Sequence, residues 1–125
     1  MLAVDTSTWI AHLQSQPGSD VQTLRQVLQS QIVFMPPVVL SELLGDPAFP
    51  DEEKVFLSGI ETLDMLPQYW ERAGAMRAKL ARKKLRPKLP NALIAQSCID
   101  YDVPLLTRDA GFAMFAEHCG LRIYE

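Results

Sequence analysis

The chain has 125 residues, of which 48% are hydrophobic, so it can fill one core. Its net charge of −3 argues against a protein that coats nucleic acid unspecifically. No apolar run approaches the roughly 20 residues that cross a bilayer, no secretory signal is visible, and two cysteines fit a reducing compartment. We therefore expect one cytoplasmic domain over residues 1–125, with no membrane segment.

The first predicted elements are an apolar strand over residues 2–4 and a helix that follows it directly. Asp5 stands at the end of the strand, and one of the hydroxyl residues at positions 6–8 is expected to cap the helix. Apolar residues of this helix are spaced as on one helix face, beginning with Trp9.

Strands and helices are predicted to alternate along the rest of the chain. The ranges are a helix capped by Ser19 or Asp20, a strand at 32–35, helices at 37–44 and from 51, a strand at 63–66, helices at 67–84 and 92–99, a strand at 105–106, a helix at 110–119 and an edge strand at 121–124. This order predicts a three-layer α/β/α sandwich with a mainly parallel sheet of roughly five strands. The apolar residues of the helix at 92–99 are too numerous for one stripe, so it should be buried on several sides.

Two carboxylates, Asp5 and Asp109, lie where predicted strands end. The carboxyl ends of parallel strands share one edge of a sheet, and ligand sites collect there. If the two strands pair, these acids become neighbours although they are about a hundred residues apart. The alternative is that each carboxylate only caps the helix that follows it.

Two further polar residues occupy unusual places. Glu42 sits in a strongly apolar predicted helix, where a charge is costly unless it is paired, bound to a cation or at the solvent edge. Asn91 follows Pro90 in the first turn of its helix, where an amide commonly serves as a hydrogen-bond partner. Neither residue indicates a function on its own.

Positive charge is concentrated just before Asn91. Eight of the twelve Lys and Arg residues fall between Arg72 and Lys88. Such a run is either a solvated helix face or a cationic rim that holds phosphates beside an active site. The residues that we expect to bind RNA in the second case are Arg82, Lys83, Lys84, Arg86 and Lys88.

Four segments together resemble a known family. They are DTS at 5–7, SELL at 41–44, PNALIAQS at 90–97 and LLTRDAGF at 105–112. In this order the segments resemble a PIN-domain ribonuclease, in particular the VapC-type toxins of toxin–antitoxin pairs. The resemblance covers the whole chain.

The resemblance implies a metal site. Asp5, Glu42 and Asp109 match acids that hold Mg²⁺ or Mn²⁺ in the family, and Thr107 matches a hydroxyl residue that holds the acids in place. Asn91 stands where the family usually has Asp, so it would be a neutral ligand. We expect weaker binding of the metal as a result.

The resemblance further implies hydrolysis of RNA phosphodiesters, a small VapB-like antitoxin as partner, and a homodimer. Two other interpretations stay open. One is a catalytically silent relative that binds RNA or a partner, which Asn91 favours. The other is a phosphatase of the haloacid dehalogenase type, which normally has a second acid where this chain has Ser7.

Overall fold

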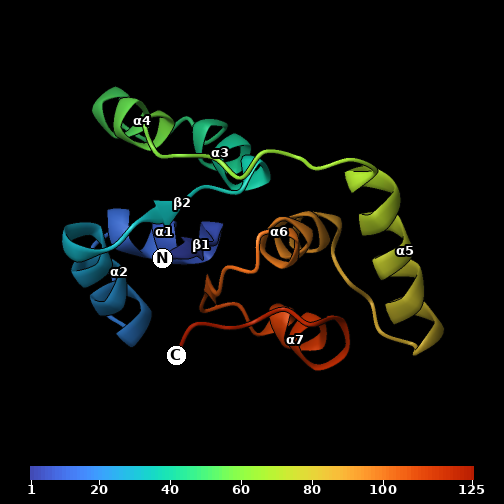
Figure 1. Ribbon diagram of the computed structural model, residues 1–125. Helices are drawn as coiled ribbons and strands as arrows, with labels where there is room; N and C mark the ends of the chain where they lie inside the picture. Colours follow the sequence, from blue (N-terminus) through green and yellow to red (C-terminus); the bar gives the residue numbers. More distant parts are fainter.

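The computed structural model describes residues 1–125, and its short strands alternate with helices (Figure 1). The elements in chain order are β1 (Leu2–Val4), α1 (Thr6–Leu13), α2 (Ser19–Ser30), β2 (Val33–Phe34), α3 (Pro37–Leu44), α4 (Asp51–Ser58), α5 (Tyr69–Arg82), α6 (Leu89–Asp100), β3 (Leu105–Leu106), the 3₁₀ turn η1 (Ala110–Phe112) and α7 (Ala113–Cys119). The predicted order of strands and helices is confirmed except at the segments predicted as strands over 63–66 and 121–124.

The sheet has three parallel strands in the order β2-β1-β3, so the prediction of five strands is wrong. The two segments predicted as outer strands do lie at the sheet edges, but each makes one parallel bridge, Met35 to Thr62 and Leu105 to Ile123. The reason is that β2 and β3 are two residues long and are bounded by Pro36 and Pro104. A proline has no backbone N–H, so it ends the ladder that a longer outer strand would need.

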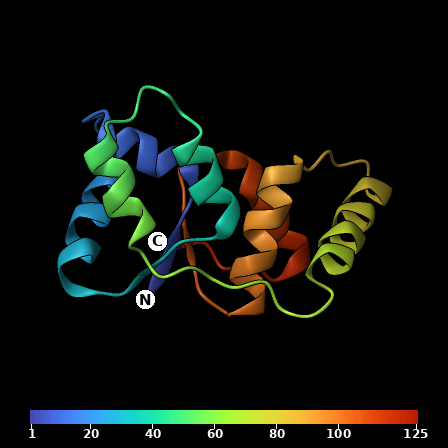
Figure 2. The ribbon, with the colours of Figure 1, turned by 90° about the horizontal axis from the view of Figure 1, so that it is seen from above.

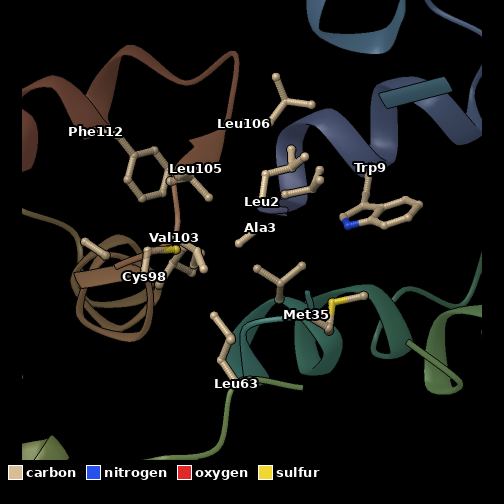
Figure 3. Packing of buried hydrophobic residues seen from close by; sticks show 14 of the residues in the cluster. Leu2, Ala3, Trp9, Met35, Leu63, Cys98, Val103, Leu105, Leu106 and Phe112 are labelled. Atoms are coloured by element: carbon tan, nitrogen blue, oxygen red, sulfur yellow. The ribbon is translucent and has the colours of Figure 1, made fainter. Parts of the chain in front are cut away.

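The core forms where β1 meets helices from both sides. α1 and α2 lie on one side of the sheet, and α6 and α7 lie on the other (Figures 1 and 2). All three residues of β1 are fully buried. Trp9 from α1, Met35 just after β2 and Cys98 from α6 pack in the same core (Figure 3). Residues 92–98 of α6 are buried without interruption, as the apolar pattern predicted.

Polar contacts attach α5 to the outside of α6. The Tyr69 hydroxyl donates a hydrogen bond to the Leu93 carbonyl at 2.6 Å, and both partners are buried. Arg72 forms an ion pair with Asp100 at the other end of α6, which also accepts a hydrogen bond from Gln96 Nε2 at 2.8 Å. α5 therefore lies against α6 and α7, at the far side of the molecule from α2 (Figure 1).

Both cysteines are free thiols, and Cys98 is buried. Burial raises the pKa of Cys98 to about 12, with a smaller contribution from the nearby charge of Asp5. This thiol is therefore uncharged at neutral pH and packs as an apolar residue. None of the helices combines the length and the apolar composition that a membrane span requires.

An ion pair joins α2 to the end of β3. Arg108 donates from Nε and Nη2 to the two carboxylate oxygens of Asp20, each at 2.8 Å, and Thr8 Oγ1 donates to Asp20 Oδ2 at 2.9 Å. Asp20 does not cap α2, whose N-cap is Gly18 without any side-chain cap. Gly18 has φ of 148°, and a Cβ there would lie 2.5 Å from Asp20 Oδ1, so a glycine is required beside this pair.

Replacing Asp20 by Asn tests this connection. The Arg108 hydrogen bond is the main reason why the pKa of Asp20 lies below its ordinary value of 3.8. A carboxylate with a lowered pKa stabilises the fold above that ordinary value, and the stabilisation is lost as the pH falls through the folded-state pKa. We expect Asp20→Asn to lower the free energy of unfolding at pH 7 and to lower it by less at pH 3, measured by urea denaturation. An equal difference at both pH values would contradict this account.

Candidate functional site

Asp5 and Asp109 each hold the start of the helical segment that follows a strand. Asp5 Oδ1 accepts a hydrogen bond from the Thr8 N–H at 3.2 Å, and Asp109 Oδ1 accepts one from the Gly111 N–H at 2.7 Å. Both acids therefore cap the helical segment that follows them. The prediction that a hydroxyl residue caps the first helix is wrong. The N-cap is Asp5, whose carboxylate accepts the hydrogen bond from the Thr8 N–H.

Capping does not remove these carboxylates from the surface that a ligand can reach. A cavity of about 270 Å³ opens at the strand ends. Its lining residues are Asp5, Thr6, Ser7, Ile10, Glu42, Lys88, Pro90, Asn91, Ile94 and Asp109. Residues from the ends of β1 and β3, from α3 and from the start of α6 thus meet in one place. The strand ends and the start of α6 lie along one edge of the molecule in Figure 2.

Asp5 is the most deeply buried acid of this cavity, with only 3% of its surface exposed. Burial raises its pKa above the ordinary value. Hydrogen bonding from Thr107, Ser7 and the Thr8 N–H opposes this increase, whereas the charge of Asp109 adds to it. The carboxylate is therefore costly to ionise in the bare protein, and a cation beside it would offset that cost.

Thr107 connects the two strand-end acids. Its hydroxyl oxygen accepts a hydrogen bond from the Asp109 N–H at 2.9 Å, and the hydroxyl group is close enough to Asp5 to lower the pKa of that residue. Thr107 does not line the cavity itself. Its hydroxyl group contacts Asp5 and the backbone of Asp109 from outside the cavity.

Glu42 lies on the opposite wall of the cavity, in α3. It is exposed, so the solvent-edge alternative describes its burial correctly. Thr6 Oγ1 donates a hydrogen bond to Glu42 Oε1 at 2.6 Å. This contact between the first turn of α1 and α3 was not anticipated from the sequence, because no pattern relates two residues 36 positions apart.

Asn91 faces the strand-end acids and does not cap its own helix. Its Nδ2 donates a hydrogen bond to Asp109 Oδ2 at 3.3 Å. An aspartate at this position would lack the donor and would face Asp109 as a second negative charge. The Asn91 amide thus offsets part of the negative charge of Asp109 by a hydrogen bond.

Gly111 is a site residue that the sequence reasoning missed. A Cβ at this position would lie 3.0 Å from Asp109 Oδ1 and 3.1 Å from Asn91 Nδ2, which is tighter than ordinary packing. The only sequence signal is the glycine two residues after Asp109. Its φ is not positive, so the need is for space beside the two side chains and not for an unusual backbone.

The donor chemistry of the cavity fits a hard cation. No three His, Cys, Asp or Glu side chains are close enough to form a closed metal cluster. Oxygen ligands suit Mg²⁺ and Mn²⁺, and Mg²⁺ commonly uses one or two carboxylates and keeps several waters. Asp5 and Asp109, with Glu42 and the Asn91 amide across the cavity, match that type of site.

The residues predicted to bind RNA are all exposed, and none of them is in an ion pair. Lys88 lines the cavity with the acids. Arg86 lines a different cavity. Arg82, the last residue of α5, and Lys83 and Lys84, which follow it, do not line the acidic cavity. The structure therefore places one of the five basic residues directly at the acidic cavity.

Known proteins resemble this chain in both sequence and fold. The sequence profile of the PIN domain matches residues 2–117. VapBC2 from Rickettsia felis, solved bound to a DNA fragment from its promoter, is similar with a TM-score of 0.74 and 20% identity, over 98% of this chain and 96% of that one. VapBC-5 from Mycobacterium tuberculosis, a member of the VapBC family of toxin–antitoxin systems, is similar with a TM-score of 0.70 and 22% identity, over 99% and 97%. No curated protein matches the sequence.

Replacing Gly111 by Ala tests the packing around Asp109 and Asn91. We expect the methyl group to displace both side chains and to lower the free energy of unfolding by about 1 kcal/mol, at the low end for overpacking. Two-dimensional NMR should show a shifted Asn91 side-chain amide signal. Gly74→Ala is the matched control, because a Cβ there meets nothing within 4 Å and should stabilise α5 by about 1 kcal/mol. Similar stability changes in both variants would contradict the tight contact at Gly111.

Proposed function

The chain belongs to the PIN-domain family, and we propose on that premise that it is a metal-dependent endoribonuclease, the toxin of a type II toxin–antitoxin pair. The observation that carries the proposal is the shared cavity in which Asp5, Glu42, Asn91 and Asp109 meet from four separate elements. The likeness of the whole chain to the VapBC structures supports the role as a toxin.

The proposed cation is Mg²⁺ or Mn²⁺, held mainly by Asp5 and Asp109. Two carboxylates about 4 Å apart repel each other by about 4 kcal/mol at an effective dielectric constant near 20, which a dication between them would reverse. Glu42 and Asn91 would complete the site, directly or through water. A bound dication supplies a water of lowered pKa and stabilises charge on a phosphate.

The protein residues around the acids have distinct proposed roles in RNA hydrolysis. Glu42, which is exposed and held by Thr6, is placed to orient a water as a base. Lys88 at the rim carries an unpaired positive charge that would hold a phosphate of the substrate. Thr107 positions Asp109 through its backbone N–H. No serine, cysteine or histidine nucleophile is required.

We propose further that the protein acts in the cytoplasm as a homodimer. Its partner would be a small VapB-like antitoxin. A basic side chain of such an antitoxin, placed among Asp5, Glu42 and Asp109, would substitute for the cation and exclude RNA. This inhibition is electrostatic and follows from the acidic lining of the cavity.

The second candidate function is a catalytically silent relative that binds RNA or a partner. The observation in its favour is the hydrogen bond from Asn91 to Asp109, because an amide there satisfies one acid without any cation. The two candidates differ in metal binding, which can be measured directly.

Restoring the acid by Asn91→Asp tests the proposed mechanism. A fourth charge should strengthen attraction for the cation, so we expect Mn²⁺ affinity and Mn²⁺-dependent RNA cleavage to rise by about tenfold. Asp109→Asn should abolish cleavage and weaken Mn²⁺ binding, whereas Glu52→Gln, at an exposed acid of α4, should change neither. Calorimetric titration of Mn²⁺ and a fluorescent RNA cleavage assay are the measurements.

Two outcomes would count against the nuclease. The first is cleavage that persists in chelator and is equal in wild type and Asn91→Asp. The second is the absence of Mn²⁺ binding in wild type and Asn91→Asp alike, which would favour the silent relative.

Reversing the charges of Lys83 and Lys84 to Glu tests the basic segment. If each residue neutralises one phosphate of single-stranded RNA, the slope of log affinity against log salt should become shallower by about 1.4, or 0.7 for each residue. Reversal of Arg25, an exposed residue of α2 outside this segment, is the control. Affinity and slope equal to those of the control would identify the segment as a solvated surface.

A further inference from the structure

A second cavity lies beside the segment that links α5 to α6. Its volume is about 490 Å³, and it is larger than the acidic one. Its lining residues are Gly74, Arg77, Ala78, Ala81, Leu85, Arg86 and Pro87. It contains two arginines and no acid, so we refer to it as the arginine cavity.

Arg77 is incompletely satisfied by the protein. The residue is half-buried, and its Nε is buried without a hydrogen-bond partner. Neither Arg77 nor Arg86 forms an ion pair in the structure. Because neither guanidinium has an acidic partner, each positive charge is free to pair with an anion that enters the cavity. The planar fork of arginine donors matches the oxygens of a phosphate.

The shape of the cavity leaves room for such a group. Three of its lining residues on α5 are small, namely Gly74, Ala78 and Ala81. A Cβ at Gly74 would meet nothing within 4 Å, so neither packing nor backbone conformation requires a glycine there. The open volume in front of Arg77 therefore depends on side chains being absent from this helix face.

The arginine cavity is connected to the acidic cavity through the backbone. Arg86 lines the first and Lys88 lines the second, and two residues span at most about 7 Å. The linking segment and the start of α6 lie along the same edge as the strand ends (Figure 2). A single polyanion can thus contact both cavities, with the exposed charges of Lys83 and Lys84 nearby.

We infer that the arginine cavity binds a backbone phosphate of the RNA whose cleavage site lies in the acidic cavity. The inference rests on the proposed ribonuclease function and adds Arg77 as a binding residue outside the catalytic centre. A polyanion is favoured because positive charges without an ion-pair partner continue from Arg77 through Arg86 to Lys88.

Binding of a single-stranded RNA oligomer in chelator, without cleavage, tests the inference. Arg77→Gln and Arg86→Gln should each make the slope of log affinity against log salt shallower by about 0.7, which corresponds to about fivefold weaker binding at 0.1 M salt when the salt-dependent part vanishes near 1 M. Arg25→Gln, which removes an exposed arginine of α2, should retain the wild-type slope.

A steric pair of variants tests the cavity without changing any charge. Gly74→Leu should fill the space in front of Arg77 and weaken RNA binding to a similar degree. Gly74→Ala should bind RNA like the wild type, because one methyl group leaves most of the volume open. Thermal unfolding of both variants shows whether α5 is intact.

The outcomes separate this inference from the proposed function. Suppose that the wild type binds and cleaves RNA, and that both arginine variants and Gly74→Leu bind it as Arg25→Gln does. The inference about the arginine cavity is then wrong, whereas the proposed ribonuclease function is retained. If the wild type does not bind RNA, both fail. NMR titration with inorganic phosphate identifies the source of the ligand. A shift of the Arg77 Nε signal with phosphate but not with RNA would overturn the inference in favour of a site for free phosphate.

Discussion

The burial of Asp5 at the end of the central strand is the constraint on which the site depends. Asp5 follows β1, which is completely buried, so its carboxylate is held almost entirely out of water. It remains there because Thr8, Ser7 and Thr107 supply hydrogen bonds. The same bonds that start α1 therefore fix the direction of the carboxylate. One orientation of the Asp5 carboxylate thus both caps α1 and lines the acidic cavity.

Asn91 changes the electrostatics of this site without changing its shape. An amide keeps an oxygen near the position of a carboxylate oxygen, but it also donates to Asp109. The acids are thereby partly neutralised by the protein itself. A Cβ at Gly111 would lie tightly against Asp109 and Asn91, so both side chains would have to shift to admit it. The arrangement therefore keeps Asp109 partnered by protein groups alone.

The distribution of charge divides the strand-end edge into two regions. Acids from β1, α3 and β3 line one cavity, and arginines from α5 and the segment after it line the other. α5 is held to α6 by Tyr69 and by the Arg72–Asp100 pair, so the position of the basic region is fixed by contacts far from it. A cavity lined by acids and a cavity lined by arginines thus lie two residues apart along the chain, at Lys88 and Arg86.

Glu42 and Asn91 were predicted to join the strand-end acids only through the resemblance to a known family. The sequence by itself determined the alternation of strands and helices, the burial of α6, and the places of Asp5 and Asp109 at strand ends. These follow from local patterns, because an apolar run that stops at a polar residue marks a strand end wherever it occurs. Only the tertiary structure decided that the sheet has three strands, that Asp5 caps α1 itself, and that Gly111 and Arg77 matter. Those features depend on contacts between residues distant in sequence and on empty space beside them. A linear pattern of residue types records neither.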